Sequence, residues 1–82
     1  MDNKRIAVAA IVIDEPEAVP SVNEILHEYS GLIIGRMGIP YQPKAVRIIS
    51  VVLDAPVDTI NALTGKIGKI EGVNAKTVYS NV

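Results

Sequence analysis

RIAVAAIVID (residues 5–14) is apolar without interruption from Ile6 to Ile13 and is rich in β-branched side chains. It ends at Asp-Glu-Pro, which is typical of a strand stopped by a turn. A strand with one wet face alternates apolar and polar residues, whereas this stretch is apolar at both alternating sets of positions. We therefore predict a central strand of a sheet that is buried on both faces.

KAVRIISVVLDA (residues 44–55) has the same two-sided apolar character and predicts a second central strand. Each of these strands is followed by a helical pattern, because apolar residues recur there at spacings of three and four. We expect Gly31 to cap the first helix and Gly72 to cap the second. The first apolar stripe consists of Val19, Val22, Leu26 and Tyr29, and the second of Ile60, Leu63, Ile67 and Ile70.

Two further extended segments, residues 31–40 and 73–80, complete the order βαββαβ. This order predicts an α+β, ferredoxin-like sandwich: a four-stranded antiparallel sheet of spatial order 4-1-3-2 with both helices on one face. We expect residues 1–82 to form this single domain. The helices would leave the other sheet face open, and an apolar face of that size predicts coverage by a second subunit.

Composition limits the classes of function. The chain has 82 residues, a net charge of −1 and no cysteine, so disulfides and thiolate metal sites are excluded, and self-association is the favoured reinforcement of a small core. The chain has no basic stripe for nucleic acid, and its longest apolar run is too short to span a bilayer. We expect a cytoplasmic protein with no direct nucleic-acid or membrane contact.

Two glycines lie in the predicted second helix, where each costs about 1 kcal/mol relative to alanine. Helical geometry places them away from the apolar stripe and in line with two polar residues. This gives a flat stripe of small residues that would let another backbone approach closely. The predicted interface stripe consists of Asn61, Thr64, Gly65 and Gly68. The alternative is a locally weak helix whose exposed glycines have no partner.

Few residues offer chemistry. His27 is the only histidine, so we expect a structural or solvated role for it and no metal site within one chain. Arg36 lies between Gly35 and Gly38, and either holds an anionic ligand or, as we favour, pairs with a carboxylate of the first helix, Glu24 or Glu28. No Ser-His-Asp set can be assembled. We expect neither an enzyme nor a bound cofactor.

Three stretches carry a family resemblance: VNEILHEYS (22–30), GRMGIPY (35–41) and TINALTGKIGKIEGVNAKTV (59–78). With them the chain resembles the small ACT-like family of proposed regulators of the iron-only hydrogenase system. The resemblance covers nearly the whole chain and implies a self-associating ferredoxin-like fold of the ACT-like kind. It also implies a regulatory role in organisms that assemble this hydrogenase.

ACT-like domains often bind small effectors at a subunit interface, between the first strand–helix turn and the second strand. The resemblance therefore implies a ligand site at Asp14, Glu15, Gly31, Leu32, Ile33 and Ile34, with Arg36 as a further candidate. Our first hypothesis is a homo-oligomeric regulatory module that binds a small effector or a protein of the hydrogenase maturation system. The second is an oligomeric scaffold with no small ligand, and the third is an enzyme that uses Arg36 and an interface carboxylate.

Overall fold

The computed structural model describes residues 4–81, which form four strands and two helices in the predicted order βαββαβ. The elements are β1 (Lys4–Ile13), α1 (Val19–Glu28), β2 (Ile33–Tyr41), β3 (Val46–Pro56), α2 (Val57–Gly68) and β4 (Val73–Tyr79). Three single turns of 3-10 helix connect them, η1 (Pro16–Ala18), η2 (Ser30–Leu32) and η3 (Gln42–Lys44).

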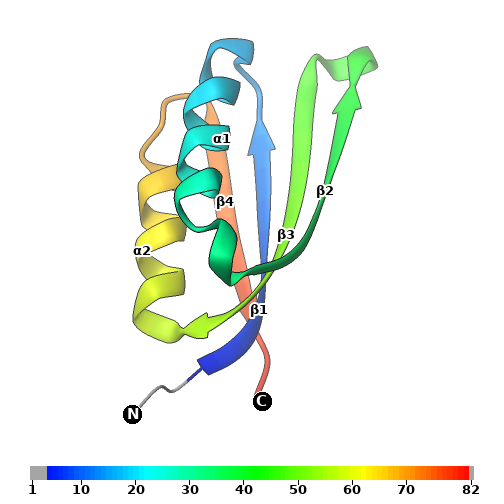
Figure 1. Ribbon diagram of the computed structural model, residues 1–82. Helices are drawn as coiled ribbons and strands as arrows, with labels where there is room; N and C mark the ends of the chain where they lie inside the picture. The colour runs from blue at the N-terminus through cyan, green and yellow to red at the C-terminus, as the bar shows by residue number, and fades with distance from the viewer. Residues whose placement is uncertain (1–3, 82) are drawn as a thin grey trace.

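The sheet has the order β2-β3-β1-β4, the order predicted from the sequence, and its strand pairs are antiparallel. Both helices lie on one face of it, over the β4 and β1 side, and β2 forms the far edge (Figure 1). Every residue of β2 after Ile33 is exposed. The ferredoxin-like fold is confirmed, with β2 reaching beyond the cover of the helices.

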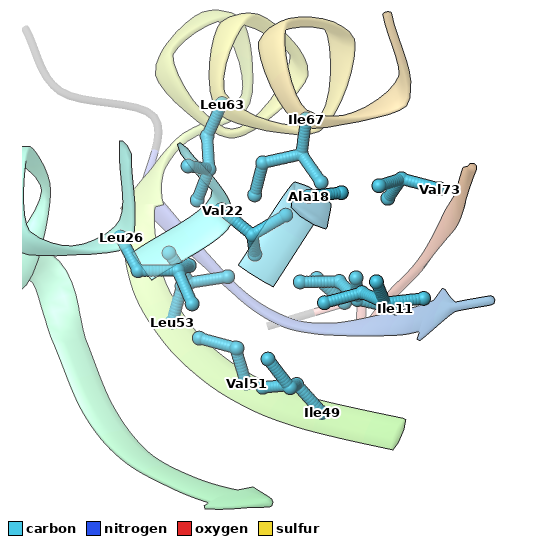
Figure 2. Close-up of a cluster of buried hydrophobic side chains, with 12 residues drawn as sticks. Ile11, Ala18, Val22, Leu26, Ile49, Val51, Leu53, Leu63, Ile67 and Val73 are labelled. Atoms are coloured by element: carbon cyan, nitrogen blue, oxygen red, sulfur yellow. The ribbon is translucent and has the colours of Figure 1, made fainter. Parts of the chain in front are cut away.

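The core lies between the helices and one face of the sheet. In Figure 2, Leu63 and Ile67 point from α2 toward the sheet residues, and Val22 of α1 joins them. Alternation along β1 and β3 supplies the sheet side of the core, since every second residue faces the helices. The buried residues of these two strands are Ala7, Ala9, Ile11, Ile13, Ile49, Val51, Leu53 and Ala55.

The helix ends differ from two of the expectations. Gly31 does not cap α1, because the helix ends at Glu28 and Gly31 lies inside η2. α2 ends at Gly68 and so does not include Ile70. Gly68 is therefore the last helical residue, where a glycine disturbs a helix less than in its interior, and only Gly65 lies within the body of the helix.

Gly72 ends the turn after α2 in the left-handed region, with φ of 83°. A side chain is disfavoured there, so this glycine is required by the backbone. The Gly72 carbonyl oxygen also accepts a hydrogen bond from the Asp14 amide at 2.9 Å. The turn before β4 is thereby joined to the turn after β1. Neither helix within residues 4–81 has the length and apolar character needed to cross a membrane.

Candidate functional site

The face of the sheet opposite the helices is apolar and open. Seven large apolar side chains of the described residues are exposed, and the strand register places all of them except Ile34 on this face. The six are Val8, Val12, Met37, Ile39, Tyr41 and Val78. We call this surface the open sheet face. Cross-strand rows such as Val78–Val8–Val52 give it continuous apolar bands.

The open sheet face bears on the prediction of two-sided burial. Within one chain only the helix face of the central strands is buried, and Val8 and Val12 remain 39% and 38% exposed. The sequence pattern for two-sided burial is present, but a single chain supplies cover for one face only. Coverage of the other face by a second subunit stays a prediction.

A second feature is a hollow of about 180 Å³ on the helix side of the sheet, at the tip of the β2–β3 hairpin. Its walls come from the end of β1, η1 and the start of α1 on one side, and from the hairpin on the other. The lining residues are Ile13, Pro16, Val19, Pro40, Tyr41, Gln42, Ala45, Val46 and Arg47. We call this the hairpin hollow.

Arg47 is the only charged residue that lines the hairpin hollow. It pairs with Ile13 of β1 and Pro40 of β2 in the strand register, so the three form one row on the helix face of the sheet. Among residues 4–81, no hydrogen bond or ion pair is found for the Arg47 side chain. The hollow therefore combines an apolar wall with one unpaired guanidinium.

The predicted ligand residues fall into two groups within one chain. Asp14 and Glu15 follow the end of β1, whose last residue pairs with Arg47 on β3. Gly31 and Leu32 lie in η2, and Ile33, at the start of β2, pairs with Leu53. Arg47 and Leu53 are six residues apart on β3, about 20 Å in a strand. A site that uses both groups would have to be completed by another subunit.

Several of these residues already have structural roles. Leu32 packs against the small cluster of Ala7, Ala55 and Ile60, and Ile33 packs against the main core. Ile34 lies at a register shift in the β2–β3 pairing and is 62% exposed. The partial burial of Leu32 and Ile33 is therefore explained by packing within the chain at the start of β2.

Arg36 is joined to α1, but through a different partner from the one favoured above. Its Nη2 donates a hydrogen bond to Asn23 Oδ1 at 2.9 Å, in an exposed position. The predicted pairing with Glu24 or Glu28 is therefore wrong in its partner, although the helix is correct. Glu28 instead lies 3.8 Å from Lys66 Nζ, which also stands over the Tyr29 ring. A hydrogen bond to Tyr29 is the main cause that raises the pKa of Lys66.

The acidic turn after β1 faces the turn before β4. The side chain of Glu15 lies against Gly72, where a Cβ atom would approach it to 2.6 Å. Desolvation, followed by repulsion from Glu71, Glu17 and Asp14, raises the pKa of the Glu15 carboxyl. Within residues 4–81 there is no cluster of three or more His, Asp or Glu side chains that could hold a metal ion, and His27 is exposed.

The predicted small-residue stripe lies on the flank of α2 that borders β4, an edge strand. Tyr79 of β4 donates a hydrogen bond to Asn61, and the hydroxyls of Thr64 and Thr77 are 2.6 Å apart. Gly65 and Gly68 have no atom within 4 Å of the position a Cβ would take. Packing within the chain gives no reason for these two glycines.

Sequence reasoning missed Arg47 and the hairpin hollow, although one signal was present. Within β3 the alternating positions on the helix side of the sheet are Arg47, Ile49, Val51, Leu53 and Ala55. Arg47 is the only charge among them. A charge at a core-facing position of a strand indicates that the core does not extend that far.

Comparison with known proteins gives one family and several solved structures. Residues 5–77 match the model of the TM1266-like family, described as "Iron-only hydrogenase system regulator, putative". The structure of the uncharacterized protein TM1266 from Thermotoga maritima is similar at 44% identity and a TM-score of 0.90, over 94% of this chain and 98% of that one. None of the curated proteins compared with the chain matches it.

More distant structures are similar in fold alone. The C-terminal domain of the MgtC protein from Mycobacterium tuberculosis has a TM-score of 0.75 at 10% identity, covering 98% of this chain and 92% of that one. A formyltetrahydrofolate deformylase from Pseudomonas putida has a TM-score of 0.63 at 14% identity, covering 95% of this chain but only 29% of the enzyme.

Proposed function

Because the chain belongs to the TM1266-like family of iron-only hydrogenase system regulators, we propose that it is a non-enzymatic regulatory protein of that system. In this proposal it acts as a homo-oligomer and binds a small effector or a protein of the hydrogenase maturation system. Any contact with DNA would be supplied by another protein, since the chain has a net charge of −1 and no basic stripe.

The observation that carries the proposal is the open sheet face. Its central strand β1 is 10 residues long, and four strands about 4.8 Å apart give a face of roughly 600 Å² before side-chain relief is counted. Stable complexes bury about 800 Å² on each partner. A second copy laid on this face would therefore bury an area close to that of a stable interface.

Charge supports a second copy as the partner of this face. The alternating residues of β1 from Ile6 to Val12 that face outward are uncharged, and so are those of β3 from Val46 to Val52. An apolar centre with charges at the margin is the usual composition of a homodimer interface. An 82-residue domain also gains proportionally more from such burial than a large one.

The non-enzymatic part of the proposal rests on residue types. A chain with no cysteine and one histidine offers few nucleophile–base pairs. Its single histidine, His27, lies on the exposed side of α1.

One observation favours an alternative, a scaffold that assembles through the same surfaces and binds no small molecule. The described residues include no buried polar or charged side chain, and buried polar groups commonly orient a small ligand. Ligand-dependent stabilisation separates the two candidates, because only the effector-binding protein gains stability from a small molecule.

The proposed function can be tested in a host that assembles iron-only hydrogenase. Deletion of the gene should change hydrogenase activity or the amount of its transcript, and the native chain should reverse the change. Val8→Glu, which places a charge on the open sheet face, should fail to do so. Ala62→Glu, which places the same side chain on an exposed position of α2, should succeed. Unchanged activity and transcript after deletion would contradict the regulatory role.

A further inference from the structure

The hairpin hollow exists because the hairpin reaches past the cover of the helices. α1 begins at Val19, and the polypeptide between it and the end of β1 makes only the short turn η1. In the last row of the sheet on this face, Ile13–Arg47–Pro40, only Ile13 is buried, and Arg47 and Pro40 are exposed. The main core therefore ends at Ile13 within this row, and an apolar recess is left at its edge.

The size of the hollow suits one small organic group. Its volume is about 180 Å³, whereas an apolar cavity of about 150 Å³ in another protein holds benzene. The lining is mostly apolar and includes Ile13 and Val19 and the prolines Pro16 and Pro40. Such walls favour an aromatic or branched aliphatic body over a strongly hydrated ion.

The charge of the hollow suits an anion. The Arg47 guanidinium has no partner among residues 4–81, and a guanidinium binds a carboxylate through two parallel hydrogen bonds. Lys44 in η3 adds a second positive charge at the hairpin tip. Three acidic residues, Asp14, Glu15 and Glu17, adjoin the lining residues Ile13 and Pro16 in the sequence, and the side chain of Glu15 lies against Gly72.

We propose that the hairpin hollow is the effector site and that it binds a small carboxylate with an apolar body. The body fills the recess between η1 and the hairpin, and the carboxylate pairs with Arg47. The inference rests on the proposed function only in calling the bound molecule an effector. Binding at this site is measured on the purified protein and is independent of the regulatory role. It differs from the site implied by the family resemblance, since it lies within one chain and uses neither Arg36 nor residues 31–34.

The test is a titration of the purified full chain with phenylacetate, followed by amide chemical shifts in NMR spectra. The expected result is a saturable shift confined to the residues around the hollow, among them Ala45, Val46 and Arg47. Three further probes separate the contributions. Phenylacetamide keeps the body without the charge, acetate keeps the charge without the body, and phenethylamine reverses the charge. All three should bind at least about ten-fold more weakly than phenylacetate, because each lacks one of the two interactions.

Variants complete the design. Arg47→Gln should weaken the binding of phenylacetate about ten-fold and leave the weak binding of phenylacetamide unchanged. Because Arg47 is exposed, the fold should tolerate this substitution. Val19→Phe should block the recess and weaken the binding of both phenylacetate and phenylacetamide. Lys76→Gln, which removes a positive charge from the opposite face of the sheet, should bind phenylacetate like the native chain.

Three results would overturn the proposal. They are shifts that do not saturate, equal binding of phenylacetate to the native chain and Arg47→Gln, and preference for phenethylamine. None of these results affects the conclusion from the gene-deletion experiment, which tests the regulatory role independently. A deletion phenotype without phenylacetate binding would leave the regulator without this effector site.

Discussion

At the scale of single residues, Gly72 is the glycine of residues 4–81 that is least able to be replaced by a residue with a side chain. Its φ of 83° and the side chain of Glu15 beside it both exclude a Cβ atom. The sequence could predict that a glycine ends this helical region, because glycine commonly follows a helix. It could not predict the contact with Glu15, since the two turns are brought together only by the pairing of β1 with β4.

Gly72→Ala should therefore lower the free energy of unfolding by about 2 kcal/mol, the combined effect of a left-handed backbone and a close contact. Urea denaturation measures the change. Gly65→Ala is the matched control, because Gly65 has open space around it and lies in a helix. That substitution should stabilise the fold by about 1 kcal/mol. Equal effects of the two substitutions would contradict the requirement at Gly72.

Glu15 gives a pH-dependent prediction. Desolvation and three neighbouring carboxylates raise its pKa in the folded state above the ordinary value of 4.5. The folded state thus holds the proton more tightly, so the contribution of Glu15 to stability is full below pH 4.5 and is lost as the pH rises through the raised value. Glu15→Gln should raise the melting temperature at pH 7, and the gain should disappear below pH 4.5.

Thermal unfolding across this pH range checks the expectation for Glu15. Glu24→Gln, on the exposed side of α1, serves as the control for loss of one negative charge. If both variants gain the same amount at pH 7, the local cluster around Glu15 has no special effect.

At the scale of elements, the two-sided apolar runs of β1 and β3 and the apolar stripe of α2 were sufficient to predict these strands and this helix, and the order βαββαβ was sufficient to predict the sheet order. The helix ends were less predictable: Ile70 fits the apolar stripe of α2, yet the helix ends at Gly68. The partner of Arg36 was also missed. Asn23 and Glu24 are adjacent on α1, and a shift of one residue along the helix determines which of the two side chains points to Arg36.

The junction of α2 and β4 contains a hydroxyl pair whose strength can be measured. Thr64 and Thr77 are linked at 2.6 Å in a partly buried position. Thr64→Val should lower the free energy of unfolding by about 1 kcal/mol, because the Thr77 hydroxyl loses its partner. The double variant with Thr77→Val should lose less free energy of unfolding than the sum of the losses in the two single variants. Strict additivity in this cycle would show that the two hydroxyls do not interact.

The flank of α2 gives a prediction about assembly. Gly65 occupies a helix interior without any contact in its own chain that needs a glycine, so we predict that this flank is a second contact between copies. Gly65→Leu should then weaken self-association, as measured by light scattering on a size-exclusion column. Ala62→Leu, on the exposed side of the same helix, is the matched control. An unchanged assembly in Gly65→Leu would leave Gly65 as an exposed glycine with no partner.

At the scale of the whole molecule, one face of the sheet forms the core and the other remains uncovered. The sequence predicted both faces as apolar, and the register shows why one chain satisfies only one of them: both helices lie on the same side (Figure 1). The hairpin hollow could not be predicted as a cavity, because it depends on how far the hairpin extends beyond α1. Its chemistry was nevertheless visible in the charge of Arg47 among apolar alternating residues.

The central claim is that the open sheet face holds copies of this chain together. Sedimentation equilibrium of the native chain, Val8→Glu and Ala62→Glu over a range of concentrations tests it most directly, with circular dichroism to verify that each variant is folded. We predict a closed homo-oligomer for the native chain and Ala62→Glu, and a lower association state for folded Val8→Glu. A native chain that sediments as a monomer throughout the range, or a folded Val8→Glu that associates like the native chain, would contradict the claim.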